Sequence, residues 1–163
     1  MKPGDHPEFF RFPAPEGASR ESTIVLHADG RFTHDGEPVE RRDFHDALHR
    51  WLRVHPDDGR FILSNGYDWT YLRVEDTPRF VTSVKGAPPG APTLVLADGT
   101  EEPLDATTLV VDAEGALFAR VHPEQQEARF LRHAQVELAP WLTPDEPAAV
   151  LVGGVRHAIG PRR

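Results

Sequence analysis

The strongest periodic pattern of the chain lies between Glu40 and Arg53, in the run ERRDFHDALHRWLR. Its apolar residues recur at the spacing i, i+3, i+4, i+7 and i+8, and they are Phe44, Ala47, Leu48, Trp51 and Leu52. This spacing places them in one stripe along a helix. The pattern predicts a helix over 40–53 that strands cover, with Trp51 as the largest side chain in that half of the core.

Short β-branched and aliphatic runs alternate with turn sequences on both sides of this helix. Tight turns are predicted at four dipeptides, which are Asp29-Gly30, Asp35-Gly36, Asn65-Gly66 and Asp98-Gly99. The segments between them predict strands at 23–26, 31–33, 60–64, 69–74, 80–84 and 93–97. The proline-rich run 85–92, KGAPPGAP, cannot form a strand ladder and is predicted to be a loop.

The second half of the chain repeats the first. The segment 23–30 aligns with 108–115, and Trp51-Leu52 aligns with Trp141-Leu142. Leu63 and Gly66 align with Leu151 and Gly154 in the same way. The offsets differ by a few residues, as loop insertions and deletions would leave them. Chance recurrence of Asp-Gly turns and valine-rich runs is the alternative, and the matched Trp-Leu pair favours duplication.

A second helix is expected between the repeated hairpin and Trp141, in the run HPEQQEARFLRHAQVELAP. Pro123 suits the first turn of a helix, and Glu124 suits its positive end. The apolar stripe would contain Ala128, Leu131, Ala134 or Gln135, and Leu138. The fold class is therefore α+β, with two strand–strand–helix–strand–strand units whose antiparallel sheets wrap around the helices and a hairpin at 80–97 inserted between them.

Three parts of the chain follow from these patterns. Residues 1–21 form an N-terminal arm, residues 22–78 a first α+β domain, and residues 79–163 a second one. Prolines interrupt the arm, and Phe9, Phe10 and Phe12 are expected to dock it on the body as a surface strap. The alternative is a peptide that binds a partner.

Composition narrows the chemistry. The chain has 163 residues, a formal net charge of −8 and no cysteine, which excludes disulfides, thiolate catalysis and cysteine-ligated zinc. The acidic balance opposes non-specific binding of nucleic acid. We expect a cytoplasmic protein without a signal peptide or a membrane span, because no apolar run at the N-terminus is long enough for either.

One histidine motif suggests a metal site. His45, His49 and His55 give the spacing H-D-x-x-H-x-x-x-x-x-H, which matches the metzincin proteases. Asp46 replaces the catalytic glutamate of those enzymes, however, and Leu52 replaces their glycine. The only methionine is Met1, so the Met-turn is missing as well. A solvated helix face is the favoured interpretation, and a metal-dependent hydrolase is the alternative.

No other catalytic pattern is present in the sequence. No serine lies in a nucleophile elbow, and there is neither a phosphate-binding glycine loop nor a dinucleotide fingerprint. We therefore expect no cofactor and no enzymatic activity. Four arginines give the first helix a basic side, and acidic neighbours favour an ion-paired surface there over a nucleic-acid interface; they are Arg41, Arg42, Arg50 and Arg53.

In the order and spacing of several short segments, the chain resembles a bacterial family known as domain of unknown function 1285. The segments are DGRFTHDGEPV at 29–39, DGRFIL at 58–63, VEDTP at 74–78, VELA at 136–139 and Gly153-Gly154. The resemblance implies two α+β domains related by duplication, the second superficially like pleckstrin-homology folds. It implies neither an activity nor a cofactor. His122-Pro123-Glu124 departs from the family pattern beside the second helix.

The same resemblance implies a ligand site in the groove between the domains, for a protein or a nucleic acid, and a role in signalling. The leading hypothesis is a non-enzymatic binding module with a regulatory role. Trp69 and Tyr71 would be aromatic anchors, and Glu75 and Asp76 polar contacts. Arg120 and Arg129, which match arginines of the family, would bind an anion or a carboxylate. The alternative places Trp69 and Tyr71 in the core and pairs the arginines with Asp112, Glu124 or Glu127. The sequence identifies neither the partner nor the oligomeric state.

Overall fold

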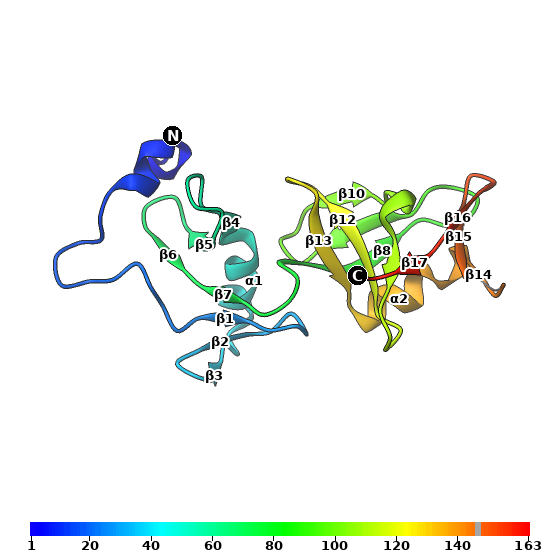
Figure 1. Ribbon diagram of the computed structural model, residues 1–163, viewed down its shortest axis with the longest axis horizontal. Coiled ribbons are helices and arrows are strands. Elements are labelled where there is room, and N and C mark those ends of the chain that lie inside the picture. The colour runs from blue at the N-terminus through cyan, green and yellow to red at the C-terminus, as the bar shows by residue number, and fades with distance from the viewer. Residues whose placement is uncertain (146–147) are drawn as a thin grey trace. The chain divides into compact units, whose positions relative to one another are not determined.

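The computed structural model describes residues 1–145 and 148–163 (Figure 1). The chain divides into two compact units, residues 1–76 and residues 77–163. Each unit has its own helix and its own sheets, and each is described separately below.

The first unit contains one α-helix and two small sheets. Two 3-10 helices, η1 (Pro3–Asp5) and η2 (Pro7–Arg11), precede them. One sheet has the strand order β3-β2-β1-β7 and the other the order β4-β5-β6. The elements are β1 (Val25–Leu26), β2 (Phe32–His34), β3 (Glu37–Pro38), α1 (Arg42–Trp51), β4 (Leu52–Val54), β5 (Phe61–Ser64), β6 (Trp69–Tyr71) and β7 (Arg73–Val74).

The helix predicted over 40–53 exists but is shorter. It ends at Trp51 because Leu52 begins β4, where it pairs with Leu63 of β5. The predicted role of Trp51 is wrong: its side chain is only half-buried, and Ala47, Leu48 and His49 are the buried residues of α1. The large buried rings of this unit are instead Phe10, Phe32 and Trp69.

The second unit contains a larger sheet, a smaller sheet and one α-helix. The larger sheet has the order β10-β9-β8-β13-β12-β11-β17, and the smaller one the order β14-β15-β16. Its elements are β8 (Arg79–Lys85), β9 (Thr93–Leu96), β10 (Glu101–Pro103), η3 (Ala106–Thr108), β11 (Val110–Val111), β12 (Leu117–Val121), β13 (Gln126–Phe130), α2 (Arg132–Leu138), η4 (Ala139–Trp141), β14 (Leu142–Thr143), β15 (Ala149–Val152), β16 (Val155–Ala158) and β17 (Gly160–Pro161).

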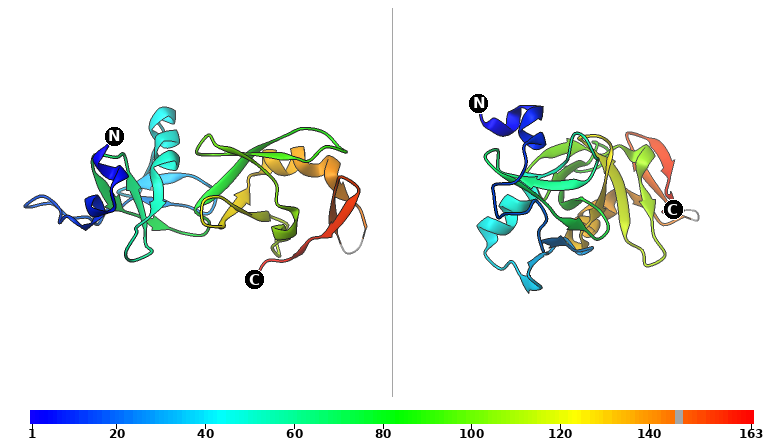
Figure 2. Two further views of the ribbon diagram at one scale, coloured as in Figure 1. Left: turned by 90° about the horizontal axis from the view of Figure 1, so that it is seen from above. Right: turned by 60° about the vertical axis from the view of Figure 1, so that its left-hand side comes forward.

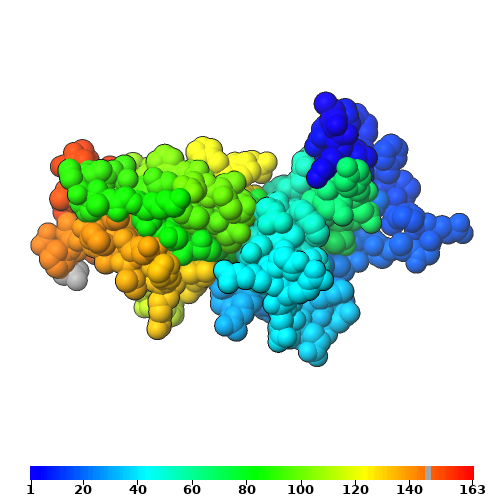
Figure 3. All heavy atoms as spheres, turned by 180° about the vertical axis from the view of Figure 1, so that it is seen from behind, coloured from blue at the N-terminus to red at the C-terminus, as the bar shows by residue number. Residues whose placement is uncertain are grey.

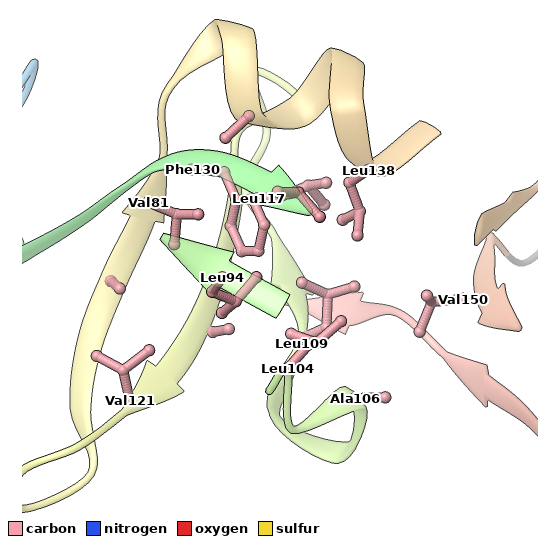
Figure 4. Packing of buried hydrophobic residues seen from close by; sticks show 14 of the residues in the cluster. Val81, Leu94, Leu104, Ala106, Leu109, Leu117, Val121, Phe130, Leu138 and Val150 are labelled. Carbon is pink, nitrogen blue, oxygen red and sulfur yellow. The ribbon is translucent and has the colours of Figure 1, made fainter. Parts of the chain in front are cut away.

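The core of this unit lies between the larger sheet and α2. Leu117, Val121 and Phe130 reach it from β12 and β13, and Leu138 reaches it from α2 (Figure 4). The helix predicted to start at Pro123 starts only at Arg132, so that part of the prediction is wrong. Ala128 belongs to β13, where every second side chain is buried, as in a strand with one face on the core.

The predicted duplication is present in the strand topology. In each repeat three strands precede the helix and three strands follow it. A last strand then pairs parallel to the first strand of the repeat. Thus β7 pairs with β1 in the first unit, and β17 pairs with β11 in the second. The first hairpins also match in register, because Val25 faces Thr33 as Val110 faces Phe118. The strands β8, β9 and β10 are the insertion, attached to the repeat through β13.

The ladder register corrects one detail of the sequence alignment. Leu52 pairs with Leu63 as Leu142 pairs with Val150, so the counterpart of Leu63 is Val150 rather than Leu151. Burial agrees with this correction, since Leu63 and Val150 are 4% and 0% exposed while Leu151 is 44% exposed. The α+β class is confirmed. Within the described residues, no helix is long and apolar enough to cross a bilayer.

Candidate functional site

The outer face of the larger sheet in the second unit gathers arginine side chains around one buried ring. Along β12, Leu117, Ala119 and Val121 point into the core, so Phe118 and Arg120 point to the opposite face. The neighbouring strand β13 places Arg129 opposite Phe118 and Glu127 opposite Arg120. Arg162 follows β17 and is fixed by its backbone N–H, which donates to the carbonyl oxygen of Val111 at 2.8 Å.

These elements enclose a pocket of about 300 Å³, called here the arginine pocket. All of its lining residues belong to the second unit; they are Thr108, Val110, Phe118, Ala119, Arg120, Glu127, Pro161, Arg162 and Arg163. Three arginines thus line one pocket in a chain whose net charge is −8. The local charge of the pocket is opposite to that of the whole chain.

Phe118 forms the apolar floor of this arrangement. Its ring is fully buried, with the guanidinium carbon of Arg162 at 3.9 Å from the ring centroid and that of Arg129 at 5.3 Å. Arginine stacks well on aromatic faces because its planar cation is weakly hydrated. The ring therefore holds two guanidinium groups near this face of the sheet.

Glu127 holds Arg162 in place. The Nε of Arg162 donates to both carboxylate oxygens of Glu127 at 3.2 Å, and its Nη2 donates to Oε1. Both side chains are about one-fifth exposed, at 21% and 22%. A fork-shaped pair of this kind is stronger and more directional than a single contact. It fixes the position of one cation at the edge of the pocket.

The guanidinium of Arg120 makes fewer contacts than that of Arg162. Its Nη1 donates to the carbonyl oxygen of Gln125 at 3.1 Å, and no carboxylate pairs with it within the described residues. Its backbone N–H donates to the hydroxyl of Thr108 at 2.9 Å, and that hydroxyl donates to the carbonyl oxygen of Asp105 at 2.8 Å. The backbone below Arg120 is thus anchored, while its exposed guanidinium retains unused donors.

The predicted aromatic anchors lie in the first unit, in a cluster on the sheet β4-β5-β6. Trp69 is 6% exposed and packs against Phe10 and Ile62. Tyr71 is half-buried, and its ring stacks on His55 at 5.8 Å between centroids. Its hydroxyl donates to Asp58 at 2.6 Å, which raises the pKa of Tyr71 and lowers the pKa of Asp58. Both rings are packed within their own unit.

The predicted polar contacts are also in the first unit, directly after β7. Glu75 accepts hydrogen bonds from Nδ1 of His27 at 2.8 Å and from the backbone N–H of Ala28 at 3.4 Å. These bonds tie the end of β7 to the turn after β1. Asp76 is exposed at the end of the unit. The residues predicted as one site therefore fall in two units, Arg120 and Arg129 in the second and the other four in the first.

The three histidines of the metal motif do not converge. His49 is buried, and its Nε2 donates to the carbonyl oxygen of Gly30 at 3.1 Å. The Nε2 of His55 donates to the carbonyl oxygen of Phe10 at 3.0 Å, on a different segment. The imidazole of His45 lies beside that of His49, with 5.0 Å between the centroids. Among the described residues, no three His, Cys, Asp or Glu side chains are arranged to hold a metal ion.

The basic side of α1 is partly neutralised. Arg41, at the N-cap of α1, pairs with Asp43 at 2.9 Å. Arg53 lies in β4 rather than on the helix, and its guanidinium is 4.5 Å from the ring centroid of Phe10. Arg42 and Arg50 are exposed. This arrangement resembles an ordinary charged helix surface, as the sequence favoured.

Sequence reasoning missed Phe118, Arg162 and Arg163 as partners of Arg120. Their proximity depends on β17, a two-residue strand that pairs with β11 across the length of the second repeat. One signal was available in the sequence. Glu75 was selected as a site residue, and Arg162 occupies the corresponding position of the second repeat.

Comparison with known proteins bears on the fold of this chain. The fold and the pocket define an α+β protein with an internal repeat and a cationic surface site. No protein-family model and no curated protein matches the chain.

Two solved structures do match, and both are described as DUF1285 family proteins. The one from Silicibacter pomeroyi DSS-3 has a TM-score of 0.65 and 16% identity, and the match covers 93% of this chain and 92% of that chain. The one from Shewanella baltica OS155 has a TM-score of 0.53 and 16% identity, over 70% of this chain and 87% of that chain. The resemblance to the family of domain of unknown function 1285 is thereby confirmed at the level of the fold.

Proposed function

We propose that this chain is a DUF1285 family protein that acts as a binding module, and that its arginine pocket takes the anionic group of a ligand. The supporting observation is the meeting of Arg120, Arg162 and Arg163 around one pocket of about 300 Å³ above a buried aromatic ring. Guanidinium groups recognise carboxylate and phosphate through paired N–H donors.

The lining chemistry favours binding over catalysis. Its one carboxylate, Glu127, is held in a bidentate pair with Arg162, and the hydroxyl of Thr108 already donates to Asp105. Neither group is arranged as a nucleophile beside a base. Arg120 is the principal donor to the ligand, and Arg162 is a second donor that the ligand shares with Glu127.

The biological setting is part of the same proposal. A binding module without catalytic chemistry suits a regulatory role, in which occupancy of the pocket is the signal. The absence of cysteine from the chain suits a reducing compartment such as the cytoplasm.

The test is a titration of the full chain with two simple probes, inorganic phosphate and succinate, followed by calorimetry and by the chemical shifts of the Arg120 and Arg162 side chains. We expect saturable binding that weakens as salt rises, since the contact is between charges. Arg120→Gln should weaken binding by about tenfold, the loss of one charge-assisted pair.

Arg50→Gln is the matched control, because it removes the same charge from an exposed position on α1 in the other unit. It should leave the affinity unchanged. Equal effects of the two substitutions, or no saturable binding of either probe, would overturn the proposal.

A further inference from the structure

The sheet β4-β5-β6 has a second face, which is turned away from α1 and covered by the N-terminal arm. Leu63 and Thr70 line an apolar pocket with Leu48 of α1. Because side chains alternate along a strand, Ile62 and Tyr71, which are paired across β5 and β6, lie on the opposite face. Phe10 of the arm packs there and is only 3% exposed.

Directional contacts fix this part of the arm. The imidazole of His55 accepts from the backbone N–H of Asp57 at Nδ1, so its Nε2 carries the proton that it donates to the carbonyl oxygen of Phe10. Arg11 forms a forked pair with Asp57, with Nη2 at 3.0 Å from Oδ1 and Nε at 3.1 Å from Oδ2. The face thus recognises an aromatic residue followed by an arginine.

A close backbone contact at the start of the arm restricts which residue can occupy that position. The N–H of Gly4 donates to the carbonyl oxygen of Gly66 at 2.8 Å. A Cβ atom on Gly4 would lie 2.9 Å from the Cα of Gly66, closer than real side chains approach. Only glycine fits at this position of the docked segment.

The second repeat shows what the same sheet looks like uncovered. By ladder register, Arg156 and Ala158 of β16 correspond to Trp69 and Tyr71 of β6. Both are exposed, and Leu151 beside them is 44% exposed. Within the described residues the equivalent positions of the second repeat are thus exposed, and the covered aromatic face of the first unit is an added recognition surface.

The arm is joined to the body in a way that permits release. Of residues 1–12 only Gly4 and Phe10 are buried, so the apolar contact that undocking breaks is concentrated at Phe10, on Ile62 and Trp69. The linker 12–19 is almost wholly exposed, and it stands away from the sheets as an extended loop (Figures 1 and 2). Figure 3 shows the dark blue arm seated against the green segment near residue 65. None of the docking contacts requires that arm and face belong to one molecule.

We propose that this aromatic face is an interaction surface for the arm of a second copy of the chain, and that two copies assemble by exchanging residues 2–11. The chain's own arm is the occupant with the right chemistry, because it supplies the phenylalanine, the arginine and the glycine that the face recognises. Exchange preserves every contact between arm and face and exposes no new surface, so a dimer can form at a small cost in free energy. Tethering favours the closed monomer at low concentration, so exchanged dimers appear as concentration rises.

The test inverts the charges of the pair between Arg11 and Asp57, whose side chains are 51% and 43% exposed and so tolerate substitution without loss of folding. Arg11→Asp places two acidic groups together within one molecule, and Asp57→Arg places two basic groups together. An equimolar mixture of the two variants can form a mixed dimer, in which each arm docks on the face of the other variant. Both exchanged contacts are then between opposite charges. We expect at least about tenfold more dimer in the mixture than in either variant alone, measured by sedimentation and by native mass spectrometry.

Two controls isolate the arm. The double variant Arg11→Asp/Asp57→Arg restores opposite charges within one molecule and should return to the wild-type level of dimer. Inversion of the pair between Arg60 and Glu21, which is similarly exposed, should give no gain on mixing. Folded variants whose mixture stays as monomeric as each alone would overturn the proposal, as would a mixture of the control pair that dimerises equally.

Discussion

Glu75 and Arg162 occupy the same position of the internal repeat. The backbone N–H of Glu75 donates to the carbonyl oxygen of Leu26 at 2.9 Å, and that of Arg162 donates to the carbonyl oxygen of Val111 at 2.8 Å. The two backbones are thus fixed identically, whereas the side chains differ in charge. Glu75 pairs with His27, and Arg162 pairs with Glu127 above Phe118. The same backbone position thus carries an anionic side chain in the first copy of the fold and, in the second, a cationic side chain that lines the arginine pocket.

Glu127→Gln should strengthen anion binding in the arginine pocket. The substitution removes the internal carboxylate that competes with a ligand for Arg162, and it keeps the shape of the side chain. We expect a gain of about three- to tenfold in the affinity for inorganic phosphate, measured by calorimetry at fixed salt. Glu124→Gln, a neutralisation outside the lining, serves as the control. An affinity that falls or stays constant in Glu127→Gln would contradict the assigned role of Arg162.

Phe10→Ala should destabilise the first unit, because the ring is almost fully buried against Ile62 and Trp69. Removal of a buried phenylalanine costs about 3–5 kcal/mol in a well-packed core, and somewhat less where the site can collapse. Phe12→Ala is the matched control, since that ring is 63% exposed. It should change the free energy of unfolding by less than about 0.5 kcal/mol. Chemical denaturation followed by tryptophan fluorescence measures both changes, and equal effects would show that Phe10 is not an anchor.

Much of the fold follows from local sequence, and the errors have local causes. The Asp-Gly turns and the alternating runs beside them locate most strands, because both signals act within a few residues. The strand β4 was missed because Leu52 fits both the helical stripe and a strand, and pairing with Leu63 decides between them. In β13 the alternation of Gln126, Ala128 and Phe130 was the correct signal, but the proline at 123 suggested a helix start instead.

The candidate site was only partly predictable. Arg120 was identified from the family resemblance, and its partners Arg162 and Phe118 were not. Arg162 joins the site through the pairing of β11 with β17, which lie about fifty residues apart, and a contact of that range leaves no periodic trace in the sequence. Trp69 and Tyr71 were identified as large side chains, but sequence alone could not show that Phe10 covers them.

Gly4→Ala should release the start of the arm without affecting the fold of the sheets. The added methyl group would meet the backbone of Gly66 at 2.9 Å, and backbone cannot move aside as a flexible side chain can. We expect the amide proton of Gly4, which is bonded to Gly66, to exchange at least tenfold faster with solvent. Gly160→Ala is the control, because a Cβ there meets nothing within 4 Å. Unchanged exchange in Gly4→Ala would refute the close contact.

Docking of the arm should weaken in acid through Asp57. The hydrogen bonds from Arg11 lower the pKa of Asp57 below its ordinary value of 3.8. A carboxyl group whose pKa is lowered by docking stabilises the docked state while it is ionised. That contribution is complete above about pH 4 and is lost as the pH falls through the lowered pKa. Protection of the arm against a protease that acts at low pH, followed from pH 5 to pH 2, should therefore decline in wild type. In Asp57→Asn, which lacks the titrating group, protection should start lower and vary less over this range. A wild-type profile parallel to that of Asp57→Asn would show that the ion pair does not hold the arm.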